Sequence, residues 1–339
     1  NNMKLYNKSV KKIKMKEEHM EEKILHLKSP LKDKAYGGHM IYDRFKLGDD
    51  PNRKVGEYWA ISAHDNGLSI IKNGEFKGKN LKEVFETHKE LFANSEEERF
   101  PLLVKINELN GAASVQVHPD DAYAKAYCND LGKAEFCLYL DVDDNALLVR
   151  GHTAKTKDEF RKMANNEEWD KLIVRKPLKS EDFVYTPPGV LHGGEGHILM
   201  AEVQQSSDIT YRVYDYDNVD AEGNPRETHL DKALEVMDVP HKEPRVAIKE
   251  KTLGNNKVIL YIDNQYFKIS RYFIKDNLKI QNEQYSLCLV LSGSGSVKVS
   301  DKEDSIKMGD AFIVTSSSSD FEIKGKVEVL ISEPPTRRK

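Results

Sequence analysis

The sequence predicts a mainly β fold of two β-rolls with a few covering helices. Short apolar runs of strand length recur between Gly, Pro, Asn and Asp residues. Few helical patterns separate these runs, which argues against a doubly wound α/β sheet. A Gly-Asp or Glu-Asp turn also leads into a strand in both halves of the chain, at residues 179–186 and 308–315. This weak internal similarity indicates that one roll is followed by a second.

The predicted strands are short. Each is a run of four to seven apolar or alternating residues bounded by turn-forming residues. They cover residues 102–106, 114–117, 136–140, 146–149, 183–186, 198–204 and 287–291.

Two longer segments have the apolar spacing of helices. Residues 82–92 place Val84, Phe85 and Leu91 on one face. Residues 156–173 begin with Thr156 and have Glu159 three positions later, which is the form of a capping box. Residues 120–127 predict a short helical turn. We expect these helices to cover the β core.

The chain divides into three predicted parts. Residues 1–19 contain six lysines and few large apolar residues, which favours a leader that is disordered or derived from a vector. Residues 20–244 form the first domain. A cluster of prolines and polar residues at 240–244 marks its end, and residues 245–339 form the second domain.

Composition excludes several classes of protein. The net charge is −4, the pI is about 6.3, and the basic residues are scattered, so we expect no nucleic-acid partner. No apolar run reaches the length of a membrane span, and the N-terminus lacks the apolar stretch of a secretory signal. The three cysteines form no CxxC pair, which favours a reducing, cytoplasmic location without disulfides.

The strongest candidate site begins with a polar strand face. Alternate residues of a strand share a face, so Ser114, Gln116 and His118 point the same way. Such a face is either the solvent side of an edge strand or the lining of a metal or ligand site. Glu135 and His192 supply further donors, the latter from a turn rich in Pro and Gly. The donors Gln116, His118, Glu135 and His192 suit zinc, although manganese, iron or cobalt stay open.

Other polar residues surround this candidate. Lys133 shares a face with Glu135, and Glu202 shares a face with Gln204. Arg212 lies among tyrosines and acidic residues in the segment 210–217. An arginine in this setting is either part of a buried ion-pair network or a clamp for an anion such as a phosphate or an enediolate.

These motifs together resemble one known family, the type I mannose-6-phosphate isomerases in their short bacterial form. The resemblance covers residues 27–331. It is carried by Gly56-Glu57-Tyr58-Trp59, by 100–105, by Gln116-Val117-His118-Pro119-Asp120-Asp121, by 132–135, by 189–192 and by 204–217, in the order that the family has.

The resemblance implies a double cupin, with a catalytic metal-binding cupin in residues 20–244 and a metal-free cupin-like domain in residues 245–339. It implies one zinc ion held by Gln116, His118, Glu135 and His192, and a catalytic Arg212. It also implies that Ser114, Lys133 and Lys105 bind the substrate, a small hexose phosphate, in a monomer or weak homodimer. The sequence departs from the family at Asn218, where many members have arginine, which puts the affinity for the phosphate in doubt.

The implied reaction interconverts D-mannose 6-phosphate and D-fructose 6-phosphate through a cis-enediolate. Glu202 is the first candidate for the base and Lys133 the second. Glu202 could instead orient Arg212 or a histidine ligand. Three other functions stay open: a metal-dependent oxygenase, against which Gln116 argues; a non-catalytic sugar-phosphate sensor; and an isomerase for another hexose phosphate, such as glucose 6-phosphate.

Overall fold

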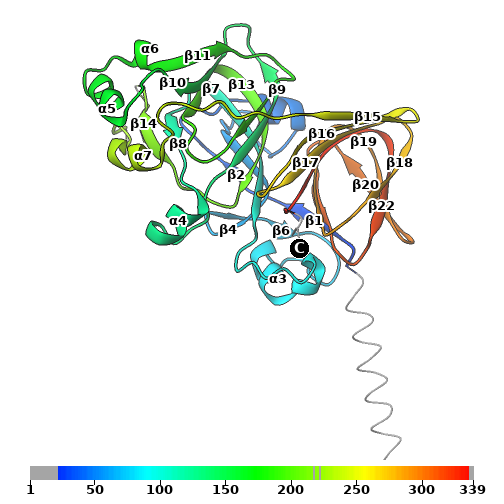
Figure 1. The fold of residues 1–339 in the computed structure, drawn as a ribbon. Helices are drawn as coiled ribbons and strands as arrows, with labels where there is room; N and C mark the ends of the chain where they lie inside the picture. Colours follow the sequence, from blue (N-terminus) through cyan, green and yellow to red (C-terminus); the bar gives the residue numbers. More distant parts are fainter. Residues whose placement is uncertain (1–21, 217, 221–222, 336–339) are drawn as a thin grey trace, which may run out of the picture. The chain divides into compact units, whose positions relative to one another are not determined.

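The computed structural model describes residues 22–216, 218–220 and 223–335, and the predicted leader at 1–19 lies outside them. The fold is mainly β, as predicted, with two ten-stranded sheets and one two-stranded sheet. The described chain forms two compact units (Figure 1). One unit contains residues 29–68 and 100–247, and the other contains residues 22–28, 69–99 and 248–335.

This division differs from a single boundary near residue 244. The chain crosses from one unit to the other for the last time after Ala247, close to the predicted boundary. Two earlier segments, residues 22–28 and 69–99, belong to the same unit as the C-terminal strands. The physical reason is strand pairing. Strand β1 (Ile24–Lys28) pairs with β21 (Ala311–Val314) and with β6 (Ile70–Ile71), so long-range hydrogen bonds place the early segments in the later roll.

The first unit, formed by residues 29–68 and 100–247, is built on a central antiparallel sheet in the order β11-β10-β13-β7-β3-β2, to which β8, β9, β12 and β14 also pair. Its strands are β2 (Leu31–Lys32), β3 (Glu57–Ile61), β4 (Ala63–His64), β5 (Gly67–Leu68), β7 (Leu102–Ala112), β8 (Val115–Val117), β9 (Glu135–Val142), β10 (Leu147–His152), β11 (Ile173–Pro177), β12 (Phe183–Thr186), β13 (His192–Gln205) and β14 (Tyr211–Tyr214).

Strand β13 organises this sheet. It pairs with β10 near His192, then with β7 and β9 along the rest of its length. Gly196 lies where the partner changes and has φ of 112°, a conformation that favours glycine. A Cβ atom there would lie 2.8 Å from the backbone of Ala146. The glycine therefore allows one long strand to serve two parts of the roll.

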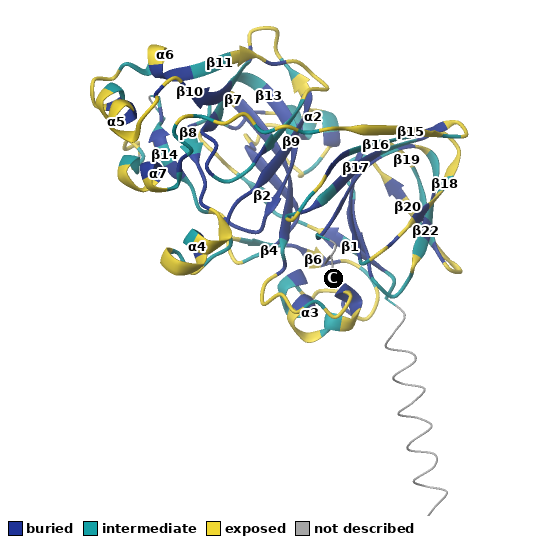
Figure 2. Cartoon of the chain, viewed as in Figure 1, coloured by how far each residue is buried: buried dark blue, intermediate teal, exposed yellow. Residues whose placement is uncertain are grey.

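The helices of this unit are α2 (Met40–Phe45), α4 (Asp121–Tyr127), α5 (Lys157–Asn165), α6 (Trp169–Leu172) and α7 (Leu230–Val236). Figure 1 shows α5, α6 and α7 beside β10, β11 and β14. Their buried side chains, among them Phe160, Leu172 and Leu234, join Val115 and Val149 of the strands in one apolar cluster. Figure 2 shows the contrast between the buried long strands and the exposed outer faces of α4 and α5.

The predicted helix at 156–173 is divided in the structure. Thr156 caps α5 as expected, because its side chain accepts a hydrogen bond from the backbone N–H of Glu159. The Glu159 carboxylate accepts from the N–H of Lys155, one residue before the cap. Glu167, between the two helices, adopts φ of 55°, which is outside the right-handed helical region. The chain therefore forms α5 and then a separate helix, α6, that begins at Trp169.

The second unit is another roll. Its strands are β1, β6, β15 (Lys249–Leu253), β16 (Asn256–Asp263), β17 (Lys268–Ile274), β18 (Asn277–Gln281), β19 (Ser286–Val299), β20 (Lys302–Lys307), β21 and β22 (Asp320–Glu333). The predicted helix at 82–92 appears as α3 (Leu81–Thr87) followed by the 3-10 helix η1 (Lys89–Phe92), with a break at His88. The core is aliphatic and aromatic, and includes Val290, Phe312, Phe321 and Val329. Among the residues described, no helix is long and apolar enough to cross a membrane.

Candidate active site

The unit that contains residues 29–68 and 100–247 encloses a cavity of about 470 Å³. Eight of the nine site residues proposed from the sequence line it. They are Lys105, Ser114, Gln116, Lys133, Glu135, His192, Glu202 and Arg212. The ninth, His118, is 1% exposed and does not line the cavity, but it contacts Glu135, which does. Strand pairing therefore brings into one cavity residues that are up to 107 positions apart in the chain.

Three of the proposed metal ligands converge at one end of this cavity. His118 Nε2 lies 3.2 Å from Glu135 Oε1, and His192 Nε2 lies 3.1 Å from Glu135 Oε2. One donor atom from each of the three side chains lies within 4.8 Å of the others. His118 follows β8, while Glu135 and His192 begin β9 and β13, so three adjacent strands aim their donors at one point.

The protonation of this cluster suits a divalent metal. His192 Nδ1 donates its proton to the carbonyl of Val190 at 2.9 Å, which leaves the lone pair of Nε2 free. Burial and the charge of Lys133 lower the pKa of His118 to about 3, so its ring is neutral at pH 7. Although burial opposes it, interactions with His118, Lys133 and His192 hold the pKa of Glu135 well below its usual range. Neutral imidazoles and an ionised carboxylate are the forms that bind metals.

The hydrogen bonding of the histidines also fits a metal. The Nε2 atoms of His118 and His192 are buried and have no hydrogen-bond partner within the described parts of the chain. A buried polar atom without a partner is costly, and a metal ion would satisfy both atoms at once. The residues present therefore fit the divalent metal that the sequence analysis proposed.

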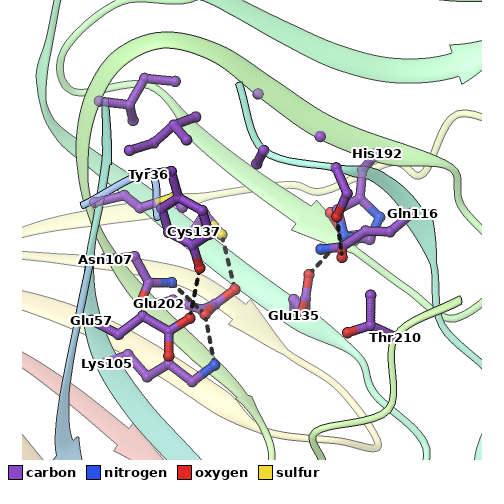
Figure 3. A pocket seen from close by; sticks show the side chains of 18 of the residues that line it. Tyr36, Glu57, Lys105, Asn107, Gln116, Glu135, Cys137, His192, Glu202 and Thr210 are labelled. Carbon is purple, nitrogen blue, oxygen red and sulfur yellow. Dashed lines mark hydrogen bonds and ion pairs between the residues drawn. The ribbon is translucent and has the colours of Figure 1, made fainter. Parts of the chain in front are cut away.

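Gln116 lies beside this cluster (Figure 3). Its backbone pairs with His192 on one side and with Arg212 on the other. Its Oε1 accepts a hydrogen bond from the hydroxyl of Ser114 at 3.3 Å. Lys133 lies 3.2 Å from Glu135 Oε1 through its Nζ. A hydroxyl, an amide oxygen and an ammonium group thus surround the three converging donors.

A second polar group occupies another part of the same cavity (Figure 3). Glu202 Oε2 accepts a hydrogen bond from Asn107 Nδ2 at 2.7 Å and lies 3.4 Å from Lys105 Nζ. The other oxygen, Oε1, accepts from the thiol of Cys137 at 3.7 Å and has no shorter hydrogen bond to the described part of the chain. Lys105 also donates to Gln204 Oε1 at 2.6 Å. Glu202 therefore has one firmly held oxygen and one that is weakly bound.

Glu57 lines the cavity next to this group and was not predicted as a site residue. It is 8% exposed and accepts hydrogen bonds from Tyr36 Oη at 3.0 Å and from Trp59 Nε1 at 2.6 Å. Burial by itself disfavours the charged form, but Lys105, Lys34 and these two donors lower the pKa of Glu57 to about 2. A charged residue inside the buried run of β3 was the signal in the sequence that could have revealed it.

Arg212 approaches the cavity from β14. Its Nη1 donates to the carbonyl of Glu227 at 3.0 Å, whereas its buried Nε has no hydrogen-bond partner in the described residues. Burial and the nearby Arg226 lower the pKa of Arg212. Arg226 also lines the cavity, where it pairs with Asp215 through two nitrogens. Arg226 was not predicted as a cavity residue, because its position depends on the return of the chain after β14.

Comparison with known proteins agrees with this geometry. A family model of the catalytic domain of type I phosphomannose isomerase matches residues 24–146, and a model of the mannose-6-phosphate isomerase cupin domain matches residues 257–334. The chain is 37% identical to mannose-6-phosphate isomerase of Streptococcus mutans, over 91% of this chain and 97% of that protein. It is 36% identical to mannose-6-phosphate isomerase ManA of Bacillus subtilis, over 91% and 98% of the two chains.

A solved structure is similar over the same length. The crystal structure of mannose 6-phosphate isomerase from Bacillus subtilis superposes with a TM-score of 0.88 at 38% identity, and the match covers 92% of this chain and all of that one. These findings confirm the predicted cupin fold and the predicted enzyme class, an aldose-ketose isomerase. By sequence, by fold and by the length of the match, this chain belongs to the type I mannose-6-phosphate isomerases.

Proposed function

We propose that this chain interconverts D-mannose 6-phosphate and D-fructose 6-phosphate through a cis-enediolate, with one bound zinc ion. The observation that carries the proposal is the convergence of His118, Glu135 and His192 in the cavity, with two ring nitrogens that lack partners in the described residues. Gln116 completes the proposed ligand set. Two imidazoles with two oxygen donors form a mixed set that zinc accepts. The bound ion would supply Lewis acidity, which stabilises negative charge on the sugar oxygens.

The reaction moves a proton between C1 and C2 of the open-chain sugar. We assign this transfer to Glu202, through Oε1. Asn107 and Lys105 hold Oε2, so the carboxylate is fixed in orientation, while its weakly bound Oε1 is the oxygen available to a proton. Lys133, the other candidate for the base, lies 3.2 Å from Glu135, so its ammonium group is already engaged by a proposed metal ligand.

Arg212 is the proposed donor to the developing oxyanion. Its Nε has no hydrogen-bond partner among the described residues. This N–H and the positive charge suit the oxygens of an enediolate, whose negative charge exceeds that of the ground-state sugar. A donor that binds more strongly in the transition state accelerates the reaction.

Ser114, Lys133 and Lys105 are the proposed substrate-binding residues. Ser114 and Lys133 lie beside the metal ligands and offer a hydroxyl and an ammonium group, which suit a phosphate or a sugar hydroxyl. Lys105 directs one N–H to Gln204 and faces Glu202 with another. An ammonium group has three donors, so one stays available for the substrate.

The test is an assay of fructose 6-phosphate formation from mannose 6-phosphate, before and after chelation. Activity that disappears with the chelator and returns with zinc would support the proposal. Parallel additions of manganese, iron and cobalt would identify the metal that restores the highest turnover. A folded, zinc-loaded protein that binds the sugar phosphate without converting it would overturn the proposal in favour of a sensor.

A further inference from the structure

The segment that follows β14 brings a second arginine, Arg226, to the wall of the cavity that Arg212 also lines. The chemistry proposed above does not use it. Contacts between this segment and β14 fix its position. The side chain of Arg212 donates through Nη1 to the carbonyl of Glu227 at 3.0 Å, and the N–H of His229 donates to the carbonyl of Arg212 at 2.6 Å. Residues 226–229 are therefore held against Arg212.

Asp215 fixes the orientation of the Arg226 guanidinium group. The Asp215 carboxylate, which is 6% exposed, accepts from Nε at 2.7 Å through one oxygen and from Nη2 through the other. A guanidinium group has five N–H donors in one rigid plane, and this side-on pair uses two of them. Nη1 has no hydrogen-bond partner in the part of the chain that the structure describes. Three donors of Arg226 are therefore available to a ligand.

The charges of the cavity wall are not balanced around these two arginines. Each lysine of the wall lies within 3.6 Å of a carboxylate, in the pairs Lys34–Glu57, Lys105–Glu202 and Lys133–Glu135. Arg212 and Arg226 have one carboxylate between them within the described residues, that of Asp215. The lowered pKa of Arg212, which burial and then the charge of Arg226 cause, agrees with this excess of positive charge. An anionic ligand would balance it.

A phosphate monoester has the charge and the shape for this part of the wall. It carries between one and two negative charges at neutral pH, and two of its oxygens accept parallel N–H bonds from one guanidinium group. The loop is tied to the wall near Ser114, since Asn218 Nδ2 donates to the carbonyl of Ala112 at 2.8 Å. Asn218 is engaged in this contact and does not line the cavity, so the loop presents Arg226 to a ligand.

We propose that Arg226 binds the phosphate group of the substrate through the edge of its guanidinium group that Asp215 leaves free. Arg226 would thereby select phosphorylated sugars over free ones, while the Nε of Arg212 stays available to the sugar oxygens. This inference rests on the proposed function for the identity of the ligand, a hexose phosphate. It does not depend on which residue transfers the proton.

The first test compares kcat and KM for mannose 6-phosphate in a double variant, Arg226→Met with Asp215→Asn. Both charges are removed together, so that no buried carboxylate is left without its partner. KM should rise by roughly tenfold or more, because charge-assisted hydrogen bonds to the phosphate are lost. The charge of the phosphate does not change during the reaction, so kcat should stay within about threefold.

Arg175 supplies the matched control. Its Nε donates to Glu195 at 2.7 Å and its side chain is 22% exposed, close to the 23% of Arg226, but neither Arg175 nor Glu195 lines the cavity. Arg175→Met with Glu195→Gln therefore removes a similar ion pair and should leave KM unchanged. The KM of Arg226→Lys should lie between those of the unsubstituted enzyme and the double variant, since lysine keeps the charge and loses the planar fork.

Binding of inorganic phosphate separates the phosphate contact from turnover. The line width of its phosphorus-31 NMR signal is measured with chelated protein, in which the ion cannot bind a metal. The unsubstituted protein should broaden the signal, and added mannose 6-phosphate should reverse the broadening by competition. Arg226→Met with Asp215→Asn should bind phosphate about tenfold more weakly, whereas the control pair at Arg175 and Glu195 should bind it normally.

Phosphate binding that is unchanged in the double variant would overturn the inference, even if KM rises, as would the absence of phosphate binding by the unsubstituted protein. If the double variant does not fold, Arg226→Lys decides the question, because it leaves a cation beside Asp215; unchanged phosphate binding in that variant would overturn the inference. Failure of the proposed function looks different: the unsubstituted, zinc-loaded protein would bind mannose 6-phosphate through Arg226 and form no fructose 6-phosphate.

Discussion

Arg212 is bound through one end of its guanidinium group, since Nη1 donates to Glu227 while the buried Nε has no hydrogen-bond partner in the described residues. We expect Arg212→Ala to lower kcat by about a hundredfold, because one well-placed donor to an oxyanion contributes about 2.7–4 kcal/mol. The kcat of Arg212→Lys should lie between those of Arg212→Ala and the unsubstituted enzyme, since lysine keeps the charge and loses the planar donors. Steady-state kinetics with both hexose phosphates measure this effect.

The outcome also distinguishes two roles for Arg212. A variant with unchanged kcat and a raised KM would show that Arg212 binds the ground state, for example through the phosphate, and not the developing oxyanion. The melting temperature serves as the control for folding.

The individual site residues were predictable from sequence to different degrees. Spacing alone could not bring together His118, Glu135 and His192, because their distance depends on which strands pair; the resemblance to a family supplied that information. Glu57 gained no role at that stage, since its partner Tyr36 is 21 positions away and the charge of Lys105 acts across a strand pair. Such relations are properties of the sheet, not of a local pattern.

At the scale of single elements, α5 offers a test of helix capping. Thr156→Ala removes the side-chain oxygen that accepts from the N–H of Glu159, and should lower the free energy of unfolding by about 1 kcal/mol. Thr156→Ser should keep most of this stability, because serine has a hydroxyl at the same position. Chemical denaturation measures the change, and isomerase turnover should be unaffected because Thr156 does not line the cavity. Equal midpoints for the Ala and Ser variants would show that the cap contributes nothing.

Strands were easier to predict from sequence than helix boundaries. The predicted runs at 102–106 and 183–186 match β7 and β12 in position, because alternation and apolar content are local properties. The predicted helices at 82–92 and 156–173 both break. His88 and Glu167 adopt backbone angles outside the helical region, and neither is a glycine or proline that would mark a break in sequence. The positions of these helix breaks therefore depend on tertiary contacts and not on local sequence.

At the scale of the whole molecule, metal removal should reduce stability as well as activity. Metal that binds the folded state alone stabilises it by about 2.7 kcal/mol when its free concentration is a hundredfold above Kd. We therefore expect chelation to lower the melting temperature by about 5–10 °C, and zinc to restore it. His192→Ala is the control, since its melting temperature should respond little to the chelator.

Acid should weaken the fold through Glu57. Its pKa is lowered from 4.5 to about 2 in the folded state, so its stabilising contribution is present above pH 4.5 and is lost as the pH falls towards 2. The full contribution is on the order of 3 kcal/mol. In chelated protein, the free energy of unfolding should therefore fall less steeply between pH 5 and 3 in Glu57→Gln than in the unsubstituted chain. Parallel slopes would contradict this assignment.

The pairing of β1 with β21 joins Ile24 to Val314, which follows it by 290 residues. A ribosome adds roughly 5–20 residues per second, so an apolar strand made early waits for roughly 15–60 s before its partner is synthesised. During that interval the segment Ile24–Lys28 has an open edge, and an open edge pairs readily with another chain. The protein should therefore be most prone to aggregate when many ribosomes translate the same mRNA at once and their unfinished chains lie close together.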